Sequence, residues 1–200
     1  MAFSKKQLEI LLFPKTKYTA LVCDGAIRSG KTSVMSLSFL LWAMSNFDQQ
    51  NFAICGKSVQ SAVRNVIQPL MGVTYFPKNG FRLNYSISTH CLTVTRGSRT
   101  NRFFVFGGKD ESSYMLIQGI TLAGVLLDEV ALMPRSFVEQ ALARCSVTGS
   151  KLWFNCNPEG PQHWFYKEWI LKPQAHNALH LHFTMDDNPA LSEETRRRYY

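Results

Sequence analysis

The 200-residue sequence lacks the marks of several protein classes. It has no low-complexity tract, and 46% hydrophobic with 18% charged residues is the composition of a folded domain rather than a disordered one. Its five cysteines are odd in number and widely spaced, without a CxxC motif. We therefore expect free thiols in a reducing compartment, not disulfides or zinc. The amino terminus lacks a signal-peptide cleavage pattern, and the apolar stretch SLSFLLWAM is too short and too rich in serine to cross a bilayer.

The charge balance is basic. Lysine and arginine outnumber aspartate and glutamate by 22 to 14, which gives a formal net charge of +8. This excess is compatible with a polyanionic partner. Because the basic residues are spread through the sequence, a soluble basic domain without such a partner stays open as the alternative.

Apolar runs alternate with segments of helical composition. Between residues 81 and 106, three alternating runs separated by polar turns predict antiparallel strands in or beside the sheet. The whole order predicts an α/β fold with a mostly parallel sheet and helices on both faces, in three layers. Strands are expected at 18–23, 51–58, 122–130, 151–158 and 178–185, and helices at 5–12, 33–45, 59–71, 136–145, 163–171 and from 191.

The stretch GAIRSGKTS at residues 25–33 matches the phosphate-loop pattern G-x-x-x-x-G-K-[ST] between an expected strand and an expected helix. Its glycines let backbone N–H groups turn toward phosphate oxygens, and the helix adds its positive amino-terminal end. We expect Lys31 to reach the β- and γ-phosphates of ATP and Thr32 to bind Mg²⁺. The predicted binding residues are Gly25, Ala26, Ile27, Arg28, Ser29, Gly30, Lys31, Thr32 and Ser33.

The run VLLDEV delivers two acids to the end of a buried strand. Asp128 would hold Mg²⁺ through water, and Glu129, on the opposite side of the strand end, would polarise a water as general base. A solvated acid pair is the alternative. No Asn-Lys-x-Asp guanine motif is present, so the pair favours ATP hydrolysis coupled to motion over a GTPase.

Other residues are weaker candidates. Asn155 and Asn157, after the next strand, are placed to sense the γ-phosphate, unless they form only a turn. Gln7 is placed to read adenine, or is an ordinary helix residue. Arg28 would stabilise charge on the γ-phosphate. It would otherwise pair with Glu129, or a neighbouring subunit would supply the arginine, from the candidates Arg64, Arg99, Arg102, Arg135 and Arg144.

Five phrases cover nearly the whole sequence: FSKKQ, CDGAIRSGKTS, FGGKDESSYMLIQGITLAGVLLDEV, FNCNPEGPQHWFY and FTMDDNPALS. Together they resemble the ATPase domain of the large terminase subunit, the DNA-packaging motor of tailed bacteriophages and prophages. The resemblance implies a RecA-like P-loop fold with an additional strand. It also implies Mg²⁺-dependent ATP hydrolysis that drives double-stranded DNA into a procapsid, in the host cytoplasm. The implied partners are further copies in a ring, commonly a pentamer, the portal protein and a small terminase subunit, without a membrane.

The resemblance also implies a domain boundary, and the sequence departs from the family pattern at one place in the phosphate loop. Residues 1–185 would form the ATPase domain, and 186–200 would begin a linker toward a nuclease domain, so this segment is not expected to cut DNA. Asp186 and Asp187 are expected to form a turn rather than a metal site. The family's basic residue usually occupies the third place of the loop motif, where this sequence has Ile27, with Arg28 one place later. A helicase or recombinase ATPase, and a regulatory module that binds without hydrolysis, remain as alternatives.

Overall fold

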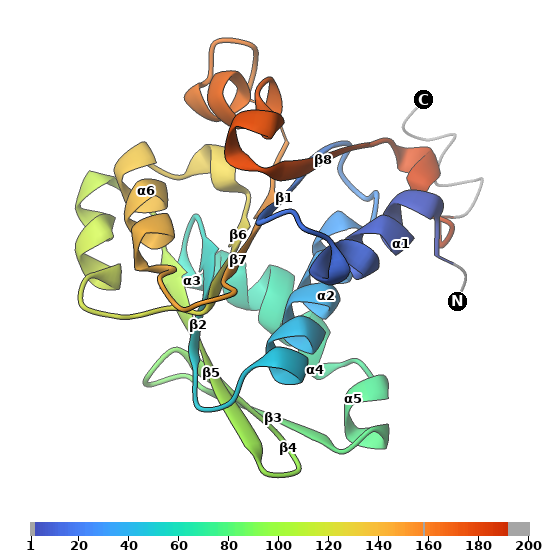
Figure 1. The fold of residues 1–200 in the computed structure, drawn as a ribbon, viewed down its shortest axis with the longest axis vertical. Coiled ribbons are helices and arrows are strands. Elements are labelled where there is room, and N and C mark those ends of the chain that lie inside the picture. The colour runs from blue at the N-terminus through green and yellow to red at the C-terminus, as the bar shows by residue number, and fades with distance from the viewer. Residues whose placement is uncertain (1–2, 158, 192–200) are drawn as a thin grey trace.

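The computed structural model describes residues 3–157 and 159–191, which form an eight-stranded sheet with helices on both faces (Figure 1). The strand order is β3-β4-β5-β2-β6-β7-β1-β8. The strands are β1 (Ala20–Gly25), β2 (Asn51–Gly56), β3 (Phe81–Ser86), β4 (Cys91–Arg96), β5 (Arg99–Gly107), β6 (Gly124–Asp128), β7 (Lys151–Asn155) and β8 (Ala178–Phe183). The α-helices are α1 (Lys5–Leu12), α2 (Lys31–Asn46), α3 (Val59–Ala62), α4 (Gln68–Met71), α5 (Tyr75–Lys78) and α6 (Arg135–Arg144).

The sheet is parallel from β5 through β2, β6, β7 and β1 to β8. The antiparallel pairs of the described sheet, β3 with β4 and β4 with β5, lie at one edge. The expected mostly parallel sheet with antiparallel strands between residues 81 and 106 is therefore confirmed. The carboxyl ends of β1, β6 and β7 meet at one edge of the sheet, where α/β proteins bind ligands.

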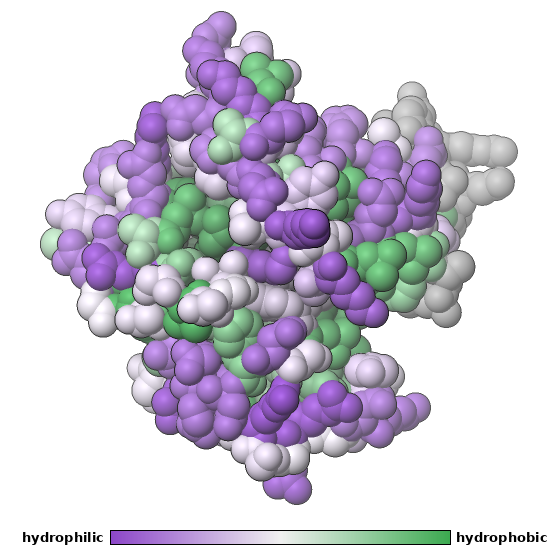
Figure 2. Space-filling model, in the orientation of Figure 1, coloured by the Kyte–Doolittle hydropathy of each residue, from purple (hydrophilic) through white to green (hydrophobic). Residues whose placement is uncertain are grey.

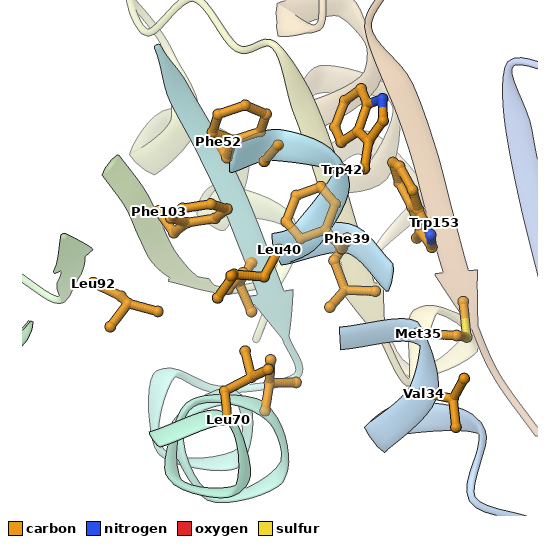
Figure 3. Close-up of a cluster of buried hydrophobic side chains, with 14 of the residues drawn as sticks. Val34, Met35, Phe39, Leu40, Trp42, Phe52, Leu70, Leu92, Phe103 and Trp153 are labelled. Carbon is orange, nitrogen blue, oxygen red and sulfur yellow. The ribbon is translucent and has the colours of Figure 1, made fainter. Parts of the chain in front are cut away.

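Two hydrophobic cores lie on the two faces of the sheet. One packs α1, α2 and the helical stretch 59–71 against the strands, and its centre is aromatic (Figure 3). There Trp42 of α2 lies against Trp153 of β7, with ring centroids 4.7 Å apart, and Phe39 meets Phe52 edge-on. The other core packs α6 and η3 (Glu111–Ile117) against the opposite face. Among the described residues, every helix is too short or too polar to span a bilayer.

The helix expected over 59–71 is present, but its middle is wider than an α-helix. Between α3 and α4, the five residues of η2 (Val63–Ile67) form a π-helical turn. Pro69, in the first turn of α4, explains the change. It lacks the N–H that would bond to the carbonyl of Asn65, and its ring would clash with that carbonyl in a regular α-helix. Pro69 thus sets the position of Asn65 through the π-helical turn.

Other boundaries differ from expectation by small amounts. β1 begins two residues later than expected, and α2 begins at Lys31 rather than at Ser33. The helix expected over 163–171 is largely the π-helical η5 (Tyr166–Ile170). Met185–Asp187 form the short 3₁₀ turn η7, which confirms the turn expected at Asp186 and Asp187. The helix expected from 191, and most of the expected linker, lie outside the described residues.

Candidate functional site

The phosphate loop joins the carboxyl end of β1 to the first turn of α2. Three of its residues have a left-handed backbone, Gly25 (φ +109°), Arg28 (φ +61°) and Gly30 (φ +80°). Gly30 is the N-cap of α2 and provides no side chain to bond the free N–H groups of the first turn. Those groups and the positive end of the helix therefore point into the loop, the arrangement that binds phosphate.

Lys31 is buried at the centre of this loop. Its ammonium donates to the carbonyl oxygens of Gly25 (3.0 Å) and Ala26 (2.7 Å) and to Ser29 Oγ (3.3 Å). Burial lowers the pKa of Lys31, against the effect of acidic neighbours that include Asp128. The structure thus encloses the ammonium within the loop, and its expected contact with the β- and γ-phosphates stays a prediction.

Asp128 ends β6, and only 2% of its surface is exposed. Its Oδ1 accepts from Asn155 Nδ2 (2.6 Å) and from Thr32 Oγ1 (3.3 Å), and its Oδ2 accepts from Asn65 Nδ2 (3.0 Å). Asn155 also donates to Thr32 Oγ1 (2.8 Å). The residues predicted for the metal, Thr32 and Asp128, are therefore in direct contact.

This cluster fits Mg²⁺. A carboxylate and a hydroxyl are the hard oxygen donors that the ion takes, and Mg²⁺ keeps several waters. The buried Oδ1 of Asn155 has no hydrogen-bond partner among the described residues. Because an unpaired buried acceptor is costly, this atom is suited to accept a hydrogen bond from a metal-bound water. Thr32 and Asp128 would hold the ion, which would neutralise phosphate charge.

Glu129 follows Asp128 with a left-handed backbone, φ +58°. Strand alternation therefore does not set its direction, since β6 ends at Asp128 and the chain turns there. Burial raises the pKa of Glu129, as does the charge of Asp128, whereas Arg64 and Lys57 lower it. A carboxylate with a raised pKa beside a phosphate site is suited to accept a proton from water.

A cleft of about 400 Å³ joins these groups. It brings together most of the predicted residues, including Glu129 and Asn157, and it adds Asn65 and Cys156. Gly25 and Ala26 are not in its wall. The wall is formed by Ile27, Arg28, Ser29, Gly30, Lys31, Thr32, Ser33, Asn65, Asp128, Glu129, Asn155, Cys156 and Asn157.

Gln7 lies in an adjoining cavity of about 240 Å³ that shares Gly30 and Ser33 with the cleft. The Gln7 side chain is buried; its Nε2 donates to the Ser29 carbonyl (3.3 Å), and its Oε1 accepts from the Ser4 amide (3.1 Å). The other walls are largely apolar: Phe3, Val34, Pro189 and Ala190, with Asn188. A flat nucleobase would fit such a pocket.

Three site contacts were not predicted. Asn65 reaches Asp128 from the π-helical turn, and Pro69 was the only local signal for it. Asn188 Nδ2 donates to the Arg28 carbonyl (2.6 Å) from 160 residues away, which no local pattern shows. Asp24, immediately before the loop, accepts from His180 Nε2 (2.7 Å) and His182 Nδ1 (3.0 Å) on β8. The two histidines are two residues apart on β8, and this spacing is the sequence signal that they share one face.

Comparison with known proteins identifies close structural relatives. The large terminase of a thermophilic bacteriophage is 52% identical, with a TM-score of 0.93 over 100% of this chain and 50% of that one. Its complex with ADP is 50% identical, with a TM-score of 0.92 over 98% and 49% of the two chains. The ATPase domain of the Thermus phage P74-26 large terminase shares the fold at 17% identity, with a TM-score of 0.67 over 100% and 91%.

The chain thus spans about half the length of the thermophilic phage terminase that it matches. Among curated protein sequences, none matches it significantly. These likenesses confirm the expected RecA-like P-loop fold. The family model for the amino-terminal part of T4likevirus-type terminase large subunits matches residues 22–199, and the chain therefore belongs to the terminase large subunit family.

Proposed function

We propose that this chain is an ATP-hydrolysing motor domain that drives double-stranded DNA into a phage procapsid. The observation that carries the proposal is the single cleft in which a phosphate loop, the Thr32–Asp128 contact and the Glu129 carboxylate meet. The thermophilic phage terminase, at 50% identity, has structures in complex with ADP and with ATP-γ-S. The nucleotide binding of this relative supports the same role for this cleft.

Each side chain has a proposed task. The loop amides and Lys31 bind the β- and γ-phosphates, while Thr32 and Asp128 hold Mg²⁺, which supplies positive charge to the phosphates. Asn65 and Asn155 fix the Asp128 carboxylate through their amide donors. Glu129 takes a proton from the attacking water. Asn157, in the same cleft, would contact the γ-phosphate, and the adenine would occupy the adjoining cavity beside Gln7.

Arg28 is the proposed arginine that stabilises charge on the γ-phosphate, since it lines the cleft in this same chain. Two of the arginines that a neighbouring subunit would otherwise supply already make contacts within their own chain. Arg135 pairs with Glu139 and Glu168, and Arg99 donates to carbonyl oxygens at the end of α2. Those bonds would have to break before either arginine reached another subunit.

The wider assembly is proposed from the family resemblance. Residues 1–185 would form the ATPase domain, followed by a linker toward the rest of a longer subunit. Copies would form a ring, commonly a pentamer, on the portal protein, supplied with DNA by a small terminase subunit. This assembly would work in the bacterial cytoplasm while docked on the procapsid.

Phosphate release from ATP, measured with and without Mg²⁺, tests the proposal. We expect Lys31→Ala to lose nucleotide binding, and Glu129→Gln to keep binding but lose hydrolysis, because a neutral amide cannot accept the proton. Glu139→Gln is the matched control, since Glu139 lies on the surface in an ion pair with Arg135. Full hydrolysis by Glu129→Gln would refute the assignment of the base, and wild-type protein that neither binds nor hydrolyses ATP would refute the proposed function.

A further inference from the structure

The net charge of the chain comes from one continuous stretch. Residues 49–109 contain eight lysines and arginines and no aspartate or glutamate. The remaining residues hold fourteen basic and fourteen acidic side chains, so they carry no formal net charge. Although the basic residues are spread through the sequence, the acidic ones are not, and the whole excess of +8 lies in this stretch. Its basic members are Lys57, Arg64, Lys78, Arg82, Arg96, Arg99, Arg102 and Lys109.

Part of this stretch forms the antiparallel strands β3, β4 and β5 at one edge of the sheet. Figure 2 shows hydrophilic side chains over the lower part of the molecule, where Figure 1 places these strands. One face of the three strands carries apolar side chains, such as Leu92, Val94 and Phe103, into the core beneath α2 and α4. The opposite core, under α6 and η3, includes no described residue of β3 or β4. The outer face of β3, β4 and the first part of β5 is therefore not covered by a helix layer, whereas Phe106 at the end of β5 packs against the opposite core.

This outer face, the basic sheet face, is defined by Arg82 and Asn84 of β3, Thr93 and Thr95 of β4, and Thr100 and Arg102 of β5. Its side chains are guanidinium, amide and hydroxyl groups without a carboxylate. Both arginines are exposed. A groove of about 400 Å³ runs over the face beside Arg102, lined also by Asn84, Thr93 and Phe104.

The two arginines differ from their basic neighbours in the stretch. Arg99 donates to the Met44 and Ser45 carbonyl oxygens, and Arg96 lies over the Phe81 ring at 4.6 Å. Within residues 3–157 and 159–191, the side chains of Arg82 and Arg102 make neither such a hydrogen bond nor such a ring contact, and they take part in no ion pair. Their charges are therefore not neutralised by a carboxylate within the described part of the chain.

The strand register sets the spacing of the two charges. Thr95 lies opposite both Arg82 and Thr100, whereas Thr93 lies opposite both Asn84 and Arg102. The arginines are thus two strands apart and offset by two residues. With strands about 4.8 Å apart and a rise of about 3.4 Å per residue, their α-carbons are separated by about 12 Å. This separation leaves room for each arginine to contact a phosphate of its own.

We propose that the basic sheet face binds the phosphate backbone of double-stranded DNA without reading its sequence. Arginine, threonine and asparagine side chains are the groups that contact phosphate oxygens in such complexes. A second copy of the chain would instead need a complementary acidic face, and outside the basic stretch the chain has no excess of acidic residues. The choice of duplex DNA as the polyanion rests on the proposed function.

Fluorescence anisotropy with two duplexes of unrelated sequence tests this surface in the variant Arg82→Gln/Arg102→Gln. Loss of one phosphate contact lowers affinity about eightfold at about 0.1 M salt, so we expect about a 60-fold loss for the pair, equal for both duplexes. The slope of log affinity against log salt should become shallower by about 1.8. The control, Lys15→Gln/Lys172→Gln, removes two exposed charges elsewhere and should retain most of the affinity and the slope.

Thermal unfolding of each variant shows whether it is folded, and the charge reversal Arg102→Glu gives an independent measurement with a larger expected loss. Equal losses in the test and control pairs would overturn the inference, as would wild-type affinity in the test pair or no duplex binding by the wild-type chain. A test pair that changes self-association in sedimentation but keeps its duplex affinity would also overturn it. ATP hydrolysis by the wild-type chain is measured separately, so the proposed function can stand or fall without this surface.

Discussion

Gly25 ends β1 and opens the phosphate loop, and we expect Gly25→Ala to damage both the sheet and the loop. A Cβ atom at this position would lie 2.1 Å from the Phe183 carbonyl oxygen and 2.9 Å from the Phe183 amide nitrogen. Both are backbone atoms of β8, so no side-chain rotation can relieve the contact. The left-handed backbone of Gly25, φ +109°, is a second obstacle to any residue with a side chain.

The cost of the change has two parts. A left-handed backbone costs a non-glycine residue about 1–2 kcal/mol. Overpacking costs about 1–3 kcal/mol more, because β8 must withdraw from its partner strand to make room. That movement would also break the 2.9 Å bond from the Ala26 amide to the Phe183 carbonyl, which holds the start of the loop. We therefore expect the free energy of unfolding to fall by about 2–5 kcal/mol, with a loss of nucleotide affinity.

Gly119→Ala separates the backbone cost from the overpacking cost. Gly119 also has a left-handed backbone, φ +79°, but a Cβ there meets no atom within 4 Å, so only the backbone cost of about 1–2 kcal/mol applies. Urea denaturation of both variants gives the difference, and titration with ADP reports the loop. Equal losses of stability in the two variants, or unchanged nucleotide affinity in Gly25→Ala, would refute the reasoning that β8 determines this glycine.

Two further predictions concern the cleft. As the proposed base, Glu129 would act only when ionised, and Arg64 lowers its pKa. Arg64→Gln should therefore move the acidic limb of the pH profile of kcat/KM to higher pH, while Lys172→Gln, at an exposed lysine elsewhere, should leave it in place. An unmoved limb in Arg64→Gln would contradict the assignment of the base. Asn65→Ala removes an amide donor from the Asp128 carboxylate, and a hydrogen bond to a charged group is worth about 1.5–3 kcal/mol. The Mg²⁺ concentration for half-maximal hydrolysis should therefore rise about tenfold or more. An unchanged Mg²⁺ requirement would argue against this positioning role of Asn65.

Much of this arrangement could be predicted from sequence because its signals are local. A glycine-rich pattern between an apolar run and a helical segment places Lys31 and Thr32, whatever the rest of the chain does. Likewise, the apolar run before Asp128 predicts a strand, and parallel strands bring their carboxyl ends to one edge. The contact between Thr32 and Asp128 follows from those two facts, and the structure shows it at 3.3 Å.

The remaining site contacts depend on tertiary packing or on backbone detail. Asn188 reaches the Arg28 carbonyl only because β8 lies beside β1. Asn65 reaches Asp128 from a π-helical turn, for which Pro69 is the only local signal in an otherwise helical pattern. The basic sheet face was missed for a different reason. Lysine and arginine are spread through the sequence and do not indicate this surface, whereas the informative feature is the absence of acidic residues between positions 49 and 109.

The two residues proposed as catalytic share an unusual backbone conformation. Arg28 and Glu129 are both left-handed, at φ +61° and +58°, and each such residue costs about 1–2 kcal/mol. Strain of this kind persists only where the surrounding structure fixes it, and it concentrates at functional sites. Arg28 is held through its carbonyl by Asn188, and Glu129 lies between the buried residues Asp128 and Val130. Gln49, His90 and Asn177 also have a left-handed backbone and do not line the cleft, so strain alone does not identify a catalytic residue. At Arg28 and Glu129 the strained backbone coincides with a position in the wall of one cleft, and this coincidence supports the roles proposed for them.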